Sequence, residues 1–294
     1  MERAQGKNVK VIGFGDNVID RYVNKNIMFP GGNAVNFAAY ARMNQAEAAY
    51  LGLFGEDAEA EHIQYALREL GVTMDYCEIQ TGSTTQHCDV CLENGDRIFG
   101  NDDKRPTNHG PKVLAEKDLE YLSEFLLIHS GCYASEETEI VKLRGLESFV
   151  TFDFSCEKEF RSEEYLSRIC PCIDLALFSA EHMTEKQVEE LQKQVYSMGT
   201  PYILVTNGTK GQTLYDGKEF YEGKVKPVKP KDTMGAGDPF FTAFVISLLR
   251  QGWKRGERLN REQIDHAFTY AADFSAKICL VDGSFGFGIP ITRK

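Results

Sequence analysis

Apolar and polar positions along the chain follow two periods in turn, one typical of strands and the other typical of helices. Short apolar runs predict strands at residues 9–13, 48–54, 125–129, 149–153, 175–178 and 202–206. Apolar positions at helical spacing predict helices at residues 33–43, 57–70, 184–198, 238–251 and 260–279. Because strands and helices alternate over nearly the whole length, we expect an α/β fold with a parallel sheet and helices on both of its faces.

Two segments break this alternation in the N-terminal half of the chain. Residues 20–28 and 86–100 have strand-like patterns without helices, and Asn94-Gly95 predicts a hairpin turn within the second segment. We expect a small β-sheet lid, formed by about residues 20–29 and 86–101, folded over the edge of the large sheet. The alternative is an ordinary antiparallel edge. We expect residues 1–294 to form a single domain.

The charge balance argues against a nucleic-acid partner. The 294 residues carry a net charge of −11, and no run of Lys and Arg exceeds two residues. A surface that binds phosphate backbones needs a basic stripe, which this sequence lacks. An anionic small substrate must then be bound by local groups rather than by the overall field.

No segment of the sequence predicts a membrane partner. Residues 1–7 are polar and lead directly into an apolar strand, unlike a signal peptide. The most apolar long stretch, residues 240–249, is too short to span a bilayer. We therefore expect a cytoplasmic protein.

The cysteines and histidines do not predict a metal centre. Cys88 and Cys91 have the spacing of half a zinc site, but no second pair completes it. Cys170 and Cys172 are equally isolated, and the six histidines form no metallohydrolase motif. We expect all eight cysteines to be reduced, structural thiols.

The strongest chemical signal is the segment 232–238, which directly precedes an apolar helix. Its small residues let several backbone N–H groups converge, and the helix start adds partial positive charge, so the segment predicts an anion site. A carboxylate beside such a site would repel phosphate unless it has a purpose. Asp238 would have such a purpose if its carboxylate accepts the proton of an attacking hydroxyl, so the segment predicts that Asp238 is a general base. The alternative is that Asp238 only caps its helix.

A second glycine-rich segment, residues 30–36, also enters a helix. Gly31 and Gly32 admit a ligand close to the backbone, and Asn33 and Asn36 offer donors and acceptors to hydroxyl groups. Upstream, Asp16 and Asp20 follow the first strand, where open α/β sheets bind ligands. These carboxylates predict contacts to a sugar, with loop solvation and turn formation as the alternative.

A third segment, residues 206–211, leaves the strand at 202–206. It predicts either a plain hairpin turn or a contact surface for a nucleotide. The sequence contains neither a P-loop nor the catalytic motifs of protein kinases.

Segments 31–36 and 232–238 together resemble the two signatures of the PfkB (ribokinase-like) carbohydrate kinase family, in order and in separation, and the resemblance extends over almost the whole chain. It implies a three-layer α/β/α fold with a β-sheet lid, ATP and Mg²⁺, and a sugar substrate, with a monovalent cation as a further candidate. It implies Asp238 as base, with Asp16, Gly32 and Asn36 near the sugar. It implies an anion hole formed by Gly235, Ala236 and Gly237. It implies nucleotide contacts from Thr206, Asn207, Gly208, Gly211 and Thr233.

Within the family, segments 15–20, 32–36, 96–100 and 152–155 are similar to fructoselysine 6-kinases, which phosphorylate a glycated lysine. The acidic residues Asp20, Asp102 and Asp103 are candidates to bind the ammonium of such a substrate. One departure concerns the metal. Many members carry Asn-x-x-Glu, which helps to organise the water around Mg²⁺, where this chain has residues 179–182. Glu181 is the candidate to substitute for the Glu of that motif from a shifted position. Pro239 also stands where a small residue is common.

Several alternatives stay open at this stage. The same fold supports fructokinases, ribokinases and nucleoside kinases, and the altered segment 179–182 is compatible with a catalytically silent sugar or nucleotide sensor. The sequence does not rank these substrates. Exposed lid strands could also pair between two subunits, which predicts a homodimer through the lid.

Overall fold

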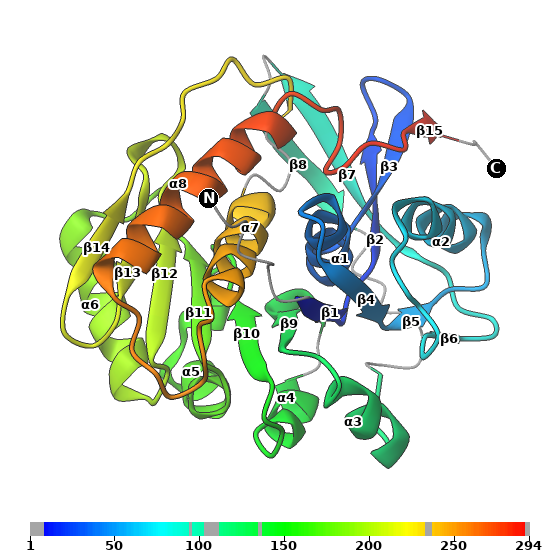
Figure 1. Ribbon diagram of the computed structural model, residues 1–294. Helices are drawn as coiled ribbons and strands as arrows, with labels where there is room; N and C mark the ends of the chain where they lie inside the picture. Colours follow the sequence, from blue (N-terminus) through cyan, green and yellow to red (C-terminus); the bar gives the residue numbers. More distant parts are fainter. Residues whose placement is uncertain (1–8, 94–95, 103–111, 135–136, 233–236, 292–294) are drawn as a thin grey trace, which may run out of the picture.

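The computed structural model describes residues 9–93, 96–102, 112–134, 137–232 and 237–291, without the side chains of 92–99 and 101–102 (Figure 1). Two sheets organise the described part of the chain, one of eight strands and one of five. A two-stranded sheet of β5 (Leu53–Phe54) and β6 (Glu78–Ile79) accompanies them.

The large sheet confirms the predicted parallel arrangement for six strands. These strands are β4 (Glu47–Leu51), β1 (Lys10–Phe14), β9 (Leu127–Gly131), β10 (Phe149–Asp153), β11 (Leu175–Ser179) and β12 (Tyr202–Thr206), in spatial order. An antiparallel hairpin, β13 (Gln212–Tyr215) and β14 (Phe220–Gly223), extends the sheet beyond β12. The sheet is therefore mixed at one edge, which the expectation of a parallel sheet did not include.

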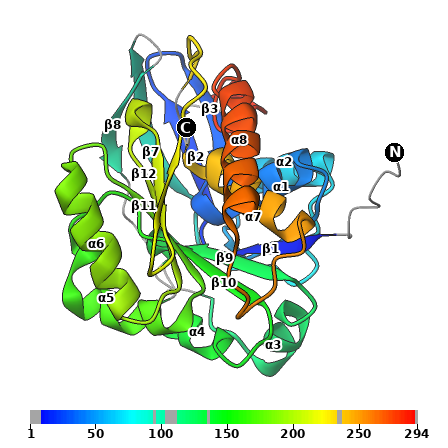
Figure 2. The ribbon, with the colours of Figure 1, turned by 60° about the vertical axis from the view of Figure 1, so that its left-hand side comes forward.

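Helices cover both faces of this sheet, so the three-layer fold is confirmed (Figure 2). Alternate strand residues point to opposite faces, and this alternation builds two cores: Ile12 and Ile128 belong to one, Val11 and Leu127 to the other. The first core is covered by α3 (Glu116–Leu122), α4 (Glu137–Leu143), α5 (Glu163–Ile169) and α6 (Glu185–Ser197). The second is covered by α1 (Asn33–Met43), α7 (Gly237–Arg250) and α8 (Arg261–Ile278).

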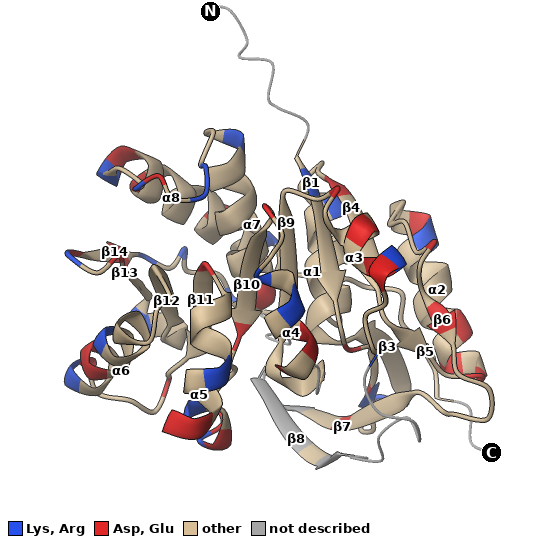
Figure 3. Cartoon of the chain, turned by 90° about the horizontal axis from the view of Figure 1, so that it is seen from below, with Lys and Arg blue, Asp and Glu red and all other residues tan. Residues whose placement is uncertain are grey.

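Many of the charged residues lie on the outer helices α2 to α6 and on α8, whereas the central strands are largely uncharged (Figure 3). A carboxylate at the end of a central strand is therefore an exception to the pattern of the fold.

The small sheet lies beside α1 and α2 (Ala58–Leu70), at the upper right of Figure 1. Its strands in spatial order are β15 (Ile289–Pro290), β3 (Ile27–Gly31), β2 (Val18–Tyr22), β7 (Gln86–Glu93) and β8 (Asp96–Asp102). Tyr22, Phe29 and Val90 form a small core of its own. The four strands from the two predicted segments share this sheet, and a strand from the end of the chain joins them. Its action as a lid and the single-domain organisation stay predictions.

Two predicted strand boundaries differ from the structure for identifiable reasons. The strand predicted at 125–129 lies at Leu127–Gly131, because the Phe125 nitrogen instead donates a hydrogen bond to Leu122 O in the turn that follows α3. The strand predicted at 48–54 is interrupted at Gly52, where a Cβ atom would collide with the Tyr50 hydroxyl.

No helix in the described part of the chain is long and apolar enough to cross a membrane.

Candidate active site

The predicted site residues gather at the carboxyl ends of the central strands, where α1 and α7 begin. Asp16 follows β1, Asn33 opens α1, and Asp238 lies in the first turn of α7. This edge is where parallel α/β sheets bind ligands, because loops and helix N-termini converge there. All three residues are partly exposed, so a ligand could reach them.

Asp238 is held by two amide side chains from α1. Asn36 Nδ2 donates a hydrogen bond to Asp238 Oδ2 at 2.7 Å, and Asn33 Nδ2 lies 3.4 Å from Asp238 Oδ1. Thr242 Oγ1 donates to the Asp238 carbonyl at 2.8 Å, within α7. Both carboxylate oxygens thus meet α1 across the site, which is more than a helix cap requires. Asn33 and Asn36 are positioned to orient Asp238, and substrate contact by either residue stays a prediction.

Asp16 anchors the start of α1. Its two carboxylate oxygens accept hydrogen bonds from the backbone nitrogens of Asn33, at 2.8 Å, and Ala34, at 3.1 Å. Burial raises the pKa of Asp16, and these N–H groups partly offset the rise. Gly32 makes this approach possible: its φ is 105°, and a Cβ atom there would lie 2.9 Å from the Asp16 carbonyl oxygen. A sugar contact through Asp16 remains a prediction.

Asp20 reaches the same place from the small sheet. It is buried on β2, and a Cβ atom on Gly31 would collide with its Oδ2 atom. The carboxylate therefore lies over the backbone that leads from β3 into α1. Asp20, Gly31 and Gly32 are brought together as predicted for a substrate surface, although their role in binding is not tested by this geometry.

Asp153 also lies at this site; sequence reasoning included it only within segment 152–155 and gave it no role of its own. It ends β10, its Oδ2 accepts a hydrogen bond from Asn33 Nδ2 at 2.9 Å, and its Oδ1 accepts one from Ser155 N at 2.7 Å. Burial raises the pKa of Asp153 to about 7, and the negative charges of Asp238 and Asp16 add to the effect. The available signal was its place at the end of a buried strand.

The predicted nucleotide turn lies next to the start of α7. Thr206 Oγ1 is 3.2 Å from Ser179 Oγ, and a Cβ atom on Gly237 would lie 4.0 Å from the same Thr206 atom. Asn207 has a buried Oδ1 without a hydrogen-bond partner in the described part of the chain. Gly211, with φ of 105°, packs against the backbone of Gly223. The turn connects β12 and β13, so it is a hairpin turn, and it also lies next to the first residue of α7.

Glu181 adjoins this turn. Its Oε1 lies 2.7 Å from the position of a Cβ atom on Gly208, so the glycine leaves room for the carboxylate. Within the described residues, no three His, Cys, Asp or Glu side chains form a metal cluster. Mg²⁺ commonly uses one or two carboxylates together with substrate phosphates, and a single carboxylate beside the nucleotide turn fits that mode. Of the predicted anion-hole and nucleotide residues, Thr233, Gly235 and Ala236 lie outside the described residues.

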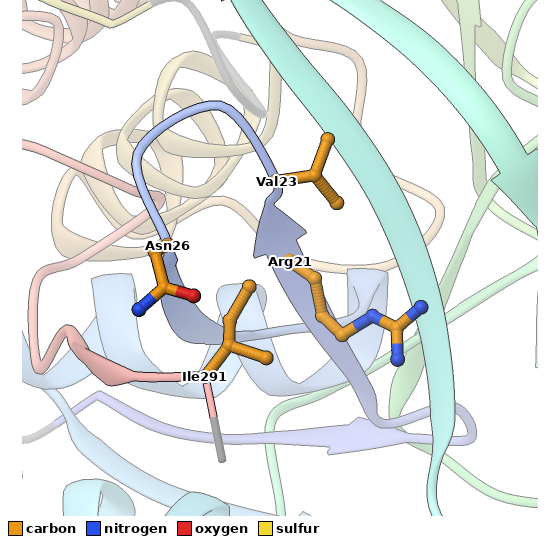
Figure 4. Close-up of a pocket in the computed structure, with 4 residues that line it drawn as sticks. All are labelled: Arg21, Val23, Asn26 and Ile291. Carbon is orange, nitrogen blue, oxygen red and sulfur yellow. The ribbon is translucent and has the colours of Figure 1, made fainter. Parts of the chain in front are cut away.

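A separate pocket of about 210 Å³ lies on the small sheet, lined by Arg21, Val23, Asn26 and Ile291 (Figure 4). Its one charged group, Arg21, pairs with Asp89 at 2.6 Å. None of the predicted site residues lines this pocket.

Comparison with known proteins identifies the family. The model of the pfkB family carbohydrate kinases matches residues 7–285. This chain belongs to that family. It is therefore a carbohydrate kinase, a phosphotransferase.

Among curated pfkB relatives, the fructosamine kinase FrlD of Bacillus subtilis (strain 168) is 32% identical over 283 residues, covering 96% of this chain and 95% of that protein. The fructoselysine 6-kinase of Escherichia coli (strain K12) is 29% identical over 245 residues, covering 83% and 89%. The crystal structure of fructokinase with bound ATP from Xylella fastidiosa has a TM-score of 0.77 at 17% identity, covering 94% of each chain. The ribokinase-like fold is thereby confirmed.

Proposed function

We propose that this pfkB kinase transfers the γ-phosphoryl group of ATP to a primary hydroxyl of a fructosamine such as fructoselysine. The observation that carries the phosphotransfer is Asp238, held by Asn33 and Asn36 at the start of α7. The substrate class is supported by the names of the two relatives at 32% and 29% identity.

Asp238 acts as the general base in this mechanism. Its carboxylate accepts the proton of the sugar hydroxyl while that oxygen forms a bond to the γ-phosphorus, and the bond from phosphorus to the ADP oxygen breaks. Asn33 and Asn36 hold the carboxylate in one orientation, which saves the entropy of aligning it during the reaction. The N-terminus of α7 places partial positive charge near the transferred group, and Gly237 with the predicted Gly235 and Ala236 donates N–H groups to it.

Mg²⁺, when bound with ATP, offsets the negative charge of the phosphates. Glu181, beside Gly208, is the residue of this chain that would hold it, directly or through water. Thr206, Asn207 and Gly211 bind and orient the nucleotide in this proposal, together with Thr233. A monovalent cation remains a further candidate cofactor.

The test is a substrate panel that measures ADP release with fructoselysine, fructose, ribose and a nucleoside. We expect ATP-dependent turnover with the highest kcat/KM for fructoselysine. A preference for fructose, ribose or the nucleoside would show that the proposed substrate class is wrong, while the assignment as a kinase would stand. Binding of a sugar without turnover of any of them would support a sensor instead.

We also propose a cytoplasmic enzyme and a homodimer formed through the small sheet. β8 lies at the edge of that sheet in the described part of the chain, and Val23 at its β2–β3 turn is 46% exposed. Open strand edges and exposed apolar residues favour pairing between subunits. Light scattering of the purified protein distinguishes a dimer from a monomer. A monomer would contradict this proposal.

A further inference from the structure

We propose that Asp153, together with the Asn33 side-chain oxygen, binds the secondary ammonium of the substrate and so selects fructosamines over neutral sugars. This inference rests on the proposed function and names the group that recognises its substrate class. It replaces the assignment of that role to Asp20, Asp102 and Asp103, of which the last two have no described side chains.

The first observation is a group of three carboxylates around one amide. The Asn33 nitrogen contacts both Asp153 and Asp238, and the Asn33 backbone nitrogen contacts Asp16. The three acidic groups are therefore close enough to face one bound sugar. In the described part of the chain, neither Asp16 nor Asp153 forms an ion pair with Lys or Arg. Grouped carboxylates in a partly desolvated site favour a positively charged ligand.

The second observation is a set of unpartnered acceptors in the same place. Only the amide nitrogen of Asn33 can face two carboxylates, so its Oδ1 atom points away from them, toward Gly131. Asn33 Oδ1 and Asn36 Oδ1 are buried and have no hydrogen-bond partner within the described residues. A buried acceptor is costly until a donor reaches it. The site therefore favours a ligand that brings hydrogen-bond donors, and a secondary ammonium brings two charged ones.

Gly131 packs directly against the Asn33 side-chain oxygen, which a larger residue would displace. It ends β9 beside β10, and a Cβ atom there would lie 2.6 Å from Asn33 Oδ1. A secondary ammonium carries two N–H groups, one for Asp153 Oδ2 and one for Asn33 Oδ1. A free ketose offers at the same position only a hydroxyl, which forms a weaker bond to a carboxylate than an ammonium does.

The position of Asp153 relative to Asp238 suits a fructosamine. Both carboxylates share the Asn33 nitrogen, so a sugar whose hydroxyl meets Asp238 extends its remaining atoms within reach of Asp153. Burial and the neighbouring carboxylates raise the pKa of Asp153, and a bound cation offsets this cost of ionising it. Asp20 is the competing residue, because it is also buried and also lies over the entrance to α1.

The test compares three sugars that differ only at the first carbon: fructoselysine, its ether analogue with oxygen in place of the amine, and fructose. The kcat/KM of each is measured for the unaltered enzyme, Asp153→Asn, Asp153→Ser and the matched control Asp20→Asn. We expect the unaltered enzyme to favour the amine over the ether about 10- to 100-fold, the range of one charge-assisted hydrogen bond. Both Asp153 variants should bring this ratio close to one, and Asp20→Asn should keep it.

Calorimetric titration of each sugar without ATP adds a readout that does not need turnover. Thermal melts show that each variant is folded, and Asp153→Ser preserves a side-chain acceptor for the Ser155 nitrogen if Asp153→Asn is poorly folded. Retention of the amine preference in a folded Asp153 variant, or its loss in Asp20→Asn alone, overturns the inference while the fructosamine proposal stands. If the unaltered enzyme shows no preference for the amine over the ether and fructose, the substrate proposal itself is wrong.

Discussion

Two carboxylates of the same sheet, the buried Asp216 and the partly buried Asp153, have opposite surroundings. Asp216 follows β13 and accepts hydrogen bonds from the backbone nitrogens of Lys218 and Glu219, at 3.0 and 2.8 Å. Arg258 pairs with it at 2.7 Å. Burial alone would raise the pKa of Asp216, but these partners outweigh it and hold the pKa below its ordinary value. Asp153 has one amide and one backbone N–H, lies near two further carboxylates, and has a raised pKa.

The difference separates a residue that stabilises the fold from one that stabilises a complex. A carboxylate with complete partners lowers the free energy of the folded chain, whereas one surrounded by acceptors raises it until a ligand arrives. At the β13–β14 edge of the sheet, the Asp216 carboxylate therefore contributes to the stability of the fold. Beside the ends of β1, β9 and β10, the Asn33 and Asn36 side-chain oxygens have no partner within the described residues, and we propose that a substrate supplies one.

The largest expected effect is on turnover, and it tests whether the unsatisfied region is catalytic at all. Asp238→Asn should keep the fold and nucleotide binding while kcat falls roughly 10²- to 10⁴-fold, because the general base is lost. Steady-state kinetics with fructoselysine and a thermal melt give both values. A near-normal kcat in a folded variant would remove Asp238 from the role of base.

The next effect tests the comparison directly through stability. The folded pKa of Asp153, about 7, is above its ordinary value of 3.8, so its contribution is favourable at low pH and is lost as the pH rises through 7. Asp153→Asn should therefore be more stable than the unaltered enzyme at pH 8, by up to about 4 kcal/mol, and the gain should vanish near pH 4. Denaturant unfolding across this pH range measures it; a variant less stable at pH 8 contradicts the comparison.

A smaller effect concerns the amide that orients the base. Asn36→Ala removes the 2.7 Å hydrogen bond to Asp238 and should reduce kcat/KM by about 10- to 100-fold, equivalent to about 1.5–3 kcal/mol. Asn44→Ala at the end of α1 is a suitable control, since Asn44 Nδ2 donates to Tyr40 O and its Oδ1 accepts from the Tyr270 hydroxyl, and neither bond involves Asp238. Equal kinetic losses in both variants would mean that Asn36 acts through the stability of α1.

A substitution of Asp16 tests whether this residue binds the sugar or only anchors the start of α1. Asp16→Ala should weaken sugar affinity by about 1.5–3 kcal/mol while ATP affinity changes little, since the Asp16 carboxylate lies at the start of α1 and not at the nucleotide turn. Calorimetry with sugar and ATP in turn separates the two. Unchanged sugar affinity would leave Asp16 with the anchoring role alone.

The smallest expected effect concerns Asp216, the carboxylate with complete partners. The pKa of Asp216 is depressed in the folded chain, so its contribution is present above the ordinary Asp range and is lost as the pH falls through the folded pKa. Asp216→Asn should lower stability by about 1–2 kcal/mol at pH 7 and by less in acid. Its pH trend is thus opposite to that of Asp153→Asn, and a parallel trend in denaturant unfolding would show that the two regions do not differ.

Local sequence patterns were sufficient for much of this protein. Alternating apolar runs predicted the central strands and the helices on both faces, because burial on a sheet requires that periodicity. Small residues before an apolar helix also predict an anion site, and Asp238 beside them predicts a base; both stay predictions. These features depend on neighbouring residues, so they can be recognised without knowing the fold.

Only the tertiary structure decided how the site residues meet. The Asn33 amide reaches Asp153 across 120 positions and Asp238 across 205, and β15 joins the small sheet from the end of the chain. The sequence contains Asp153 and Asp216 as similar acidic residues after apolar runs. Which of them lacks a basic partner depends on packing between distant elements, because charges interact through space and no local pattern records those distances.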